Sequence, residues 1–170
     1  MQRRTSETGV KFIAQHEGFR AQLYNDAAGH ATVGYGHLVH KGEVGTDLAS
    51  EAPFSNGISE AEAAELLRSD LEIAEEAVNR LVRASIRQAQ FDALVSFVFN
   101  VGVGAFSRAT LLSKLNAGFC CAVPYELRRW TLAGKRRLAG LVVRREDEAR
   151  MFAEGGANAM IGHLEKLNGS

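Results

Sequence analysis

Apolar and polar residues follow one another along the chain with spacings that predict several helices and one short hairpin. Apolar residues recur at helical spacing within residues 5–16, and Gly18 follows, a residue type that accepts the left-handed conformation just past a helix end. This predicts a helix ending at Glu17. Strand-prone pieces around Leu23 and over residues 31–35 flank a turn-favouring run, so we expect a hairpin directly after the helix.

A longer helical pattern follows a polar, glycine-containing connection over residues 38–54. Ser59 and Glu62 have the spacing of a capping box, and the pattern continues to about Val82. The expected outer face is acidic, with Glu60, Glu62, Glu65, Glu72, Glu75 and Glu76. The inner face is apolar, with Ala63, Leu66, Leu67, Leu71, Ala74, Val78 and Leu81. We interpret the acidic face as a solvated surface.

The second half of the chain predicts helices only. Ser85 and Gln88 form another capping box, which would open an apolar helix over residues 86–101. Further helices are expected over residues 109–116, 124–132 and 141–153, with Gly118 and Gly155 as stops after the first and the last.

Together these elements predict an α+β fold of one domain with two lobes. We expect a small hairpin lobe over about residues 18–58, a connecting helix over about 60–82, and a larger all-helical lobe over about 85–170 that includes the N-terminal helix. A cleft is expected between the lobes. The length of 170 residues and the hydrophobic fraction of 46% are enough for a sizeable core.

Charge is balanced overall but uneven along the chain. Lysine plus arginine and aspartate plus glutamate each number 20. Basic residues crowd the late region, namely Arg128, Arg129, Lys135, Arg136, Arg137, Arg144, Arg145 and Arg150. A solvated surface is the simplest interpretation, and attraction to an anionic polymer or a cation near Glu17 is the sharper one. Without a nucleic-acid-binding motif, we expect no nucleic acid partner.

The cysteines and the lengths of the apolar runs further limit the class of protein that we expect. Cys120 and Cys121 are adjacent and could bridge only with backbone strain, so we expect free, partly buried thiols. No stretch is long and apolar enough for a membrane span or a signal-peptide core.

Three residues around the predicted hairpin could carry chemistry. Cleavage of a glycosidic bond needs one carboxylic acid that protonates the leaving oxygen and a second, ionised group on the opposite face of the sugar. Glu17 and Asp26 could form this pair, with Thr32 folded close to both. Because a helix C-terminus carries partial negative charge, we expect Glu17 to hold its proton more readily than a free glutamate does.

Two nearby patterns have simpler explanations. His37 and His40 form a His-x-x-His pair, but no second pair of ligands lies at a recognisable spacing, so we expect structural histidines and no metal. The glycines at 29, 34 and 36 lack the helix and the lysine of a phosphate loop, and we expect them to allow tight turns.

The spacing as a whole resembles a known family. Eight residues separate Glu17 from Asp26, and five separate Asp26 from Thr32. Residues 26–37 read Asp-x-x-Gly-x-x-Thr-x-Gly-Tyr-Gly-His. This pattern is similar to that of the phage-type lysozymes, glycoside hydrolase family 24, whose members are endolysins. Residues 90–102, 127–130 and 140–146 resemble the family's central helix, its aromatic-ended segment and its late helix. The likeness therefore covers nearly the whole chain.

The resemblance implies roles for matching residues. Glu17 would be the general acid, Asp26 would orient or deprotonate the attacking water, and Thr32 would hold that water, which is the inverting route. The bond cut would be the β-1,4 bond between N-acetylmuramic acid and N-acetylglucosamine. The substrate-binding positions would be Leu38, Phe99 and Asn100, and a structural ion pair would join His37 to Asp70.

The resemblance also implies a biological setting. The partner would be peptidoglycan, and no cofactor is expected. The protein would be a monomer that accumulates in the host cytoplasm until a holin-type permeabilisation lets it reach the wall and lyse the cell. Export by another route, through an N-terminal anchor, stays open. Two other functions stay open. One is a lytic transglycosylase, in which a water-holding pair such as Asp26 and Thr32 would be idle. The other is a wall-binding or tail module without activity.

Overall fold

A computed structural model describes the backbone of residues 2–168 and the side chains of residues 2–155. The chain divides into two compact units. The hairpin unit comprises Val10–Glu72, and the helical unit comprises the N-terminal residues up to Gly9 together with the chain from Ile73 onward.

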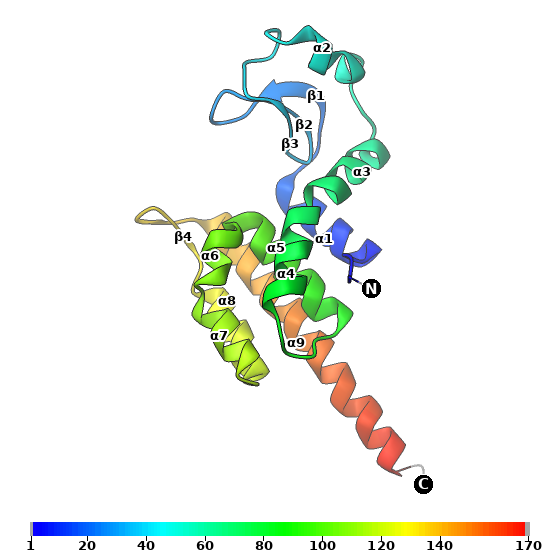
Figure 1. Cartoon of the computed structure of the whole chain (residues 1–170), viewed down its shortest axis with the longest axis vertical. Helices are drawn as coiled ribbons and strands as arrows, with labels where there is room; N and C mark the ends of the chain where they lie inside the picture. Colours follow the sequence, from blue (N-terminus) through cyan, green and yellow to red (C-terminus); the bar gives the residue numbers. More distant parts are fainter. Residues whose placement is uncertain (1, 169–170) are drawn as a thin grey trace. The chain divides into compact units, whose positions relative to one another are not determined.

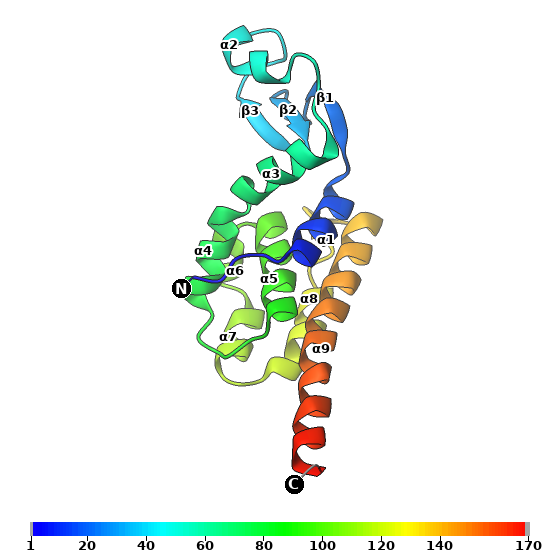
Figure 2. The same ribbon diagram turned by 90° about the vertical axis from the view of Figure 1, so that its right-hand side faces the viewer.

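The hairpin unit holds a three-stranded antiparallel sheet in the order β1-β2-β3 (Figures 1 and 2). Its elements are α1 (Glu7–Glu17, of which the part from Val10 belongs to this unit), β1 (Arg20–Asn25), β2 (Ala31–Gly34), β3 (His37–His40), α2 (Leu48–Glu51), the short 3-10 helix η1 (Ala52–Phe54) and α3 (Glu60–Asp70). The central strand β2 is buried along its whole length, and α3 packs against it. The sheet therefore has its buried side under α3.

One glycine of this unit is required by packing as well as by conformation. Gly34 has φ 65°, and a Cβ atom built there would lie 3.0 Å from the Cβ of Ala63 on α3 and 3.1 Å from Cδ1 of Ile58. A larger residue would push the helix away from the strand. The glycine thus lets α3 approach the strand that carries Thr32.

The helical unit is built around a buried central helix. Its elements are α4 (Glu72–Leu81, within this unit from Ile73), α5 (Gln88–Val101), α6 (Val103–Ser107), α7 (Thr110–Asn116), the 3-10 helix η2 (Cys120–Ala122), α8 (Val123–Arg128), β4 (Leu132–Ala133), β5 (Arg136–Arg137) and α9 (Ala139–Asn168). Residues 90–98 of α5 are all buried. Helix α9 runs alongside α5 and α8 (Figure 2).

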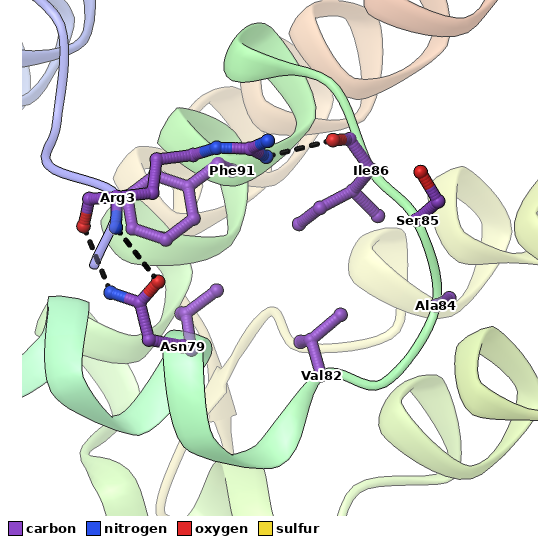
Figure 3. A pocket seen from close by; sticks show the side chains of 8 residues that line it. Arg3, Asn79, Val82, Ala84, Ser85, Ile86 and Phe91 are labelled. Carbon is purple, nitrogen blue, oxygen red and sulfur yellow. Dashed lines mark hydrogen bonds between the residues drawn. The ribbon is translucent and has the colours of Figure 1, made fainter. Parts of the chain in front are cut away.

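The N-terminal segment is fastened to this unit by side chains (Figure 3). Asn79 accepts a hydrogen bond from the Arg3 main-chain N–H at 3.1 Å and donates one to the Arg3 carbonyl at 2.8 Å. The Arg3 guanidinium donates to the carbonyl of Ile86 at 2.7 Å and lies over the ring of Phe91. It thereby lines a surface hollow of about 180 Å³ together with valine, isoleucine and phenylalanine side chains.

Most predicted elements are present, and the differences have local causes. The capping box of Ser59 and Glu62 opens α3 as predicted, but the long helix is interrupted at Leu71 between α3 and α4. The predicted connection over residues 38–54 was wrong, because it contains most of β3, all of α2 and η1. Helix α5 begins at Gln88 and not at 86, since the Gln90 side chain caps the Arg87 N–H at 3.0 Å.

The second half is not all helical, which corrects the prediction for that lobe. The helix expected over residues 124–132 ends at Arg128, and Leu132–Ala133 pairs with Arg136–Arg137 in a two-stranded sheet. Gly134, at φ 61°, begins the two-residue turn between these strands. The fold class is α+β, with a second small sheet.

The predicted stop at Gly155 was also wrong, because α9 continues to Asn168. A Cβ atom at Gly155 would lie 3.0 Å from Cβ of Ala89 and 3.3 Å from the main-chain nitrogen of Gln90. The glycine therefore serves close packing of α9 on α5 and not helix termination.

Several side chains differ from the expected exposure. Glu75, expected on the solvated face of the long helix, is 5% exposed and accepts the Thr5 N–H at 2.7 Å. Arg144 and Arg145 are buried, whereas Cys120 and Cys121 are both exposed and free. Within the described residues, no helix is long and apolar enough to cross a membrane.

Candidate active site

The turn between β1 and β2 is organised around the carboxylate of Asp26. Its Oδ1 atom accepts hydrogen bonds from the main-chain N–H groups of Ala28 at 2.8 Å and His30 at 2.9 Å. The first is the bond of an Asx turn, for which an aspartate followed by small residues and a glycine is well suited. The main chain of Asp26 closes the turn, because its N–H donates to the carbonyl of His30 at 2.9 Å. Asp26 is therefore fixed at both its main chain and one carboxylate oxygen.

These bonds determine the charge of Asp26. The hydrogen bond from the His30 main-chain N–H holds the pKa of the Asp26 carboxyl below its usual value, although burial acts in the opposite direction. Ala28, Gly29 and the His30 ring lower the pKa by smaller amounts. The carboxylate is ionised at neutral pH, with Oδ1 committed to the turn. Its Oδ2 atom lies 3.7 Å from Nδ1 of His30. Oδ2 is the oxygen that can act on a ligand.

Thr32 is joined to the same turn. Its hydroxyl donates to the carbonyl of His30 at 2.9 Å, and the residue is 3% exposed. On the sheet it lies opposite Tyr24 of β1 and Leu38 of β3. Because its hydrogen is directed to His30, the Thr32 oxygen can offer its lone pairs to a water or a ligand.

Glu17 is the last residue of α1 and is half-buried. The Gly18 N–H donates to the carbonyl of Ala14 at 3.1 Å with φ 75° at Gly18, so the helix ends as predicted. The chain then enters β1, where Arg20 pairs with Gly34 and Tyr24 with Thr32. All three predicted catalytic residues thus lie in the hairpin unit, with Glu17 before one end of the β1-β2 ladder and Asp26 at the other.

Two other predicted positions belong to β3. His37 Nδ1 lies 3.0 Å from both carboxylate oxygens of Asp70 at the end of α3. The hydrogen bond that His37 donates to the Asp70 carboxylate, helped by the charge of Asp70 and opposed by burial, raises the pKa of His37. Leu38 is 44% exposed, directly across the ladder from Thr32. The first contact ties β3 to α3, and the second leaves an apolar side chain at the surface.

Phe99 and Asn100 lie on α5 in the helical unit. The amide oxygen of Asn100 accepts a hydrogen bond from Nη2 of Arg145 at 2.8 Å, and the Arg145 guanidinium lies over the ring of Phe97. Arg145 also pairs with the buried Glu148 at 2.9 Å. With its oxygen held by Arg145, Asn100 has its amide nitrogen available as a donor.

Two residues of this arrangement were missed by sequence reasoning. His30 occupies an unspecified position of the motif, and the one available signal was that an aspartate side chain often accepts main-chain N–H groups two to four residues on. Arg145 was counted as surface charge, because spacing alone did not show that it is buried. Among the described residues, no group of three or more histidine, cysteine or acidic side chains could hold a metal ion.

The comparisons with known proteins identify the family of the chain. Residues 14–148 match the phage lysozyme family model, and the chain belongs to this family. The chain is 37% identical over 155 residues to the endolysin of Bacillus phage B103, covering 88% of this chain but only 54% of that protein. It therefore spans about half the length of this relative.

Two solved structures show the same fold over almost their full length. A mutant of P22 lysozyme superimposes with a TM-score of 0.77 at 33% identity, covering 89% of this chain and 99% of the other. The muramidase domain of SpmX from Asticaccaulis excentricus superimposes with a TM-score of 0.73 at 34% identity, covering 88% and 98%. Both are similar to this chain in sequence as well as in fold.

Proposed function

We propose that this protein is an endolysin muramidase, which hydrolyses the β-1,4 bond between N-acetylmuramic acid and N-acetylglucosamine in bacterial peptidoglycan. The observation that carries the proposal is the turn around His30, which keeps Asp26 ionised and Thr32 oriented in a chain of the phage lysozyme family. A hydrolase needs an ionised carboxylate beside a group that can hold water. Both are built into one hairpin.

The proposed reaction uses three side chains. Glu17 donates its proton to the glycosidic oxygen as the bond from that oxygen to the muramic acid anomeric carbon breaks. Water attacks this carbon from the opposite face and gives a proton to Oδ2 of Asp26. The Thr32 hydroxyl, whose hydrogen points to the His30 carbonyl, accepts a hydrogen bond from this water. Because water attacks directly, we propose inversion at the anomeric carbon.

Substrate contacts beyond the reacting bond are also part of the proposal. We propose that Leu38 packs against a sugar ring and that Phe99 does the same from α5. Asn100 would donate its amide N–H to an N-acetyl carbonyl, because Arg145 holds its oxygen. The protein would act as a monomer, reaching the wall from the host cytoplasm after membrane permeabilisation and thereby lysing the cell.

The decisive test is clearing of purified Gram-negative peptidoglycan by wild type and Glu17→Gln, followed by mass analysis of the fragments. We expect wild type to release fragments with reducing muramic acid ends and Glu17→Gln to be at least 10²-fold slower. Glu43→Gln is the matched control, because Glu43 is an exposed glutamate in a loop of the same unit. It should clear like wild type.

Other outcomes would assign another function. Anhydromuramic ends would identify a transglycosylase and remove the role given to Asp26 and Thr32. Binding to the wall without clearing by any of the three proteins would identify an inert module. Equal clearing by wild type and Glu17→Gln would remove Glu17 from the mechanism.

A further inference from the structure

His30 contributes its side chain, as well as its main chain, to the surroundings of Asp26. Its imidazole Nδ1 lies 3.7 Å from Oδ2 of Asp26, the oxygen that the turn leaves uncommitted. The side chain is 33% exposed, so solvent reaches the ring. No role follows from the family motif, since this position between Gly29 and Thr32 is one that the motif does not specify.

Other titratable groups lie on the segments that flank the turn. The loop after β3 is bonded to the turn, since the Ala31 N–H donates to the Gly42 carbonyl at 2.7 Å and the Val44 N–H donates to Asn25 Oδ1 at 2.8 Å. The titratable side chains on these neighbouring segments are Glu17, Arg20, Tyr24, His37, His40, Lys41 and Glu43. Arg20 lies over the Tyr24 ring, and His40 bonds to Glu51. Among described side chains, Asp26 alone is within ion-pair distance of His30.

We propose that His30 is a positioning residue that controls, through its protonation, whether Oδ2 of Asp26 is available to the attacking water. This rests on the proposed function. A protonated ring is attracted to Oδ2, weakens it as a base and competes with water for it. A neutral ring leaves Oδ2 free. Hydrolysis should therefore be faster in the form with a neutral ring than in the form with a protonated ring.

A substitution at position 30 tests the effect of the ring alone, because any residue except proline keeps the main-chain N–H and carbonyl that bond to Asp26 and Thr32. His30→Gln removes the charge at every pH, and His30→Arg keeps it at every pH. We would measure kcat and KM on soluble peptidoglycan fragments between pH 5 and 8. Because Glu17 must carry its proton to act as the general acid, kcat also depends on pH through Glu17 in every variant, so each kcat is divided by that of His30→Gln at the same pH. For wild type we expect this ratio to be about threefold to tenfold lower at pH 5 than at pH 8.

For His30→Arg this ratio should stay low from pH 5 to 8, with KM little changed in both variants. His40→Gln is the matched control, because it removes a ring that faces Glu51 and not Asp26. It should keep the wild-type pH dependence. A wild-type ratio that does not change with pH, or equal kcat for the glutamine and arginine variants at pH 8, would overturn the proposal.

A second measurement does not depend on activity. An NMR titration of the Asp26 carboxyl should give a higher pKa in His30→Gln than in wild type, because the variant lacks the positive ring beside Oδ2 when Asp26 titrates. An unchanged pKa would refute the coupling even in an inactive protein. If wild type and Glu17→Gln clear peptidoglycan equally while the Asp26 pKa does shift, the muramidase assignment fails and the coupling stands.

Discussion

Asp26 and His30 hold each other through both main-chain groups of the histidine. The His30 N–H donates to the Asp26 carboxylate, and the His30 carbonyl accepts the Asp26 N–H, each at 2.9 Å. The same carbonyl accepts the Thr32 hydroxyl at 2.9 Å. An ionised carboxylate and an oriented hydroxyl are therefore fixed by one residue between them, so the two groups cannot shift independently.

The hydroxyl of Thr32 can be removed without changing the shape of its side chain. Thr32→Val should slow peptidoglycan clearing by about 10²-fold, because the attacking water loses its acceptor. The free energy of unfolding should fall by only about 1 kcal/mol, since the His30 carbonyl keeps its bond from the Asp26 N–H. Initial clearing rates and urea denaturation measure the two effects.

Thr32→Ser is the matched control for that substitution, because it keeps the hydroxyl and removes only a methyl group. It should retain most of the clearing activity. If the valine variant clears as fast as the serine variant, the Thr32 hydroxyl does not hold the water.

The pair of His37 and Asp70 predicts a specific dependence of stability on pH. The pKa of His37 is raised in the folded protein, chiefly by the hydrogen bond that its ring donates to the Asp70 carboxylate. The resulting stability is fully present below the unfolded pKa of about 6.5 and is lost as pH rises through the higher folded pKa. Asp70→Asn should therefore lower the free energy of unfolding by about 1 kcal/mol at pH 5.5, and the loss should shrink towards pH 9.

Denaturant unfolding of wild type and Asp70→Asn at several pH values measures that difference. His37→Gln should show the same pH dependence as Asp70→Asn, and the double variant should add little, because both changes break one interaction. A loss of stability in Asp70→Asn that stays constant from pH 5.5 to 9 would contradict the prediction.

The hairpin and the helix ends could be predicted from sequence because they depend on local chemistry. Gly18 ends α1 by its positive φ, and Ser59 with Glu62 caps α3 through bonds three residues apart. The turn before β2 follows from an aspartate and a glycine. Such features involve residues that are neighbours along the chain, so a motif can specify them.

Features decided by distant contacts could not be predicted. Gly155 looks like a stop, but its place against Ala89 on α5 makes it part of a close helix contact. Glu75 falls on the expected acidic face, yet its carboxylate accepts the Thr5 N–H seventy residues away in the chain. Arg145 is predicted to be a surface charge, but in the structure it contacts Glu148 and Asn100. Each outcome depended on a partner that spacing does not reveal.

Asp92 holds the N-terminal segment from inside the helical unit. It is 2% exposed and accepts the Ser6 N–H at 3.1 Å, the Ser6 hydroxyl at 2.5 Å and the Gln88 amide at 2.8 Å. Asp92→Asn replaces one acceptor oxygen by an NH₂ group that faces donors. We expect a loss of about 2 kcal/mol in the free energy of unfolding, measured by urea denaturation.

Asp47→Asn is the control for that change. Asp47 caps α2 by accepting the Ser50 N–H, a role that asparagine fills equally well, so stability should be nearly unchanged. If Asp92→Asn were as stable as Asp47→Asn, the hydrogen bonds to Ser6 would contribute nothing net.

Two glycines of α9 should respond in opposite ways to the same substitution. Alanine favours a helix over glycine by up to about 1 kcal/mol, and at Gly140 nothing lies within 4 Å of the added Cβ. Gly140→Ala should therefore raise the free energy of unfolding by a few tenths of a kcal/mol near the helix start.

At Gly155 the new atom meets Ala89 at 3.0 Å and the main-chain nitrogen of Gln90 at 3.3 Å, neither of which can rotate away. Overpacking of about 1–3 kcal/mol then exceeds the gain, so Gly155→Ala should be less stable than wild type in urea denaturation. If both variants gained stability, α9 would not be packed against α5 at Gly155, and that glycine would have no packing role.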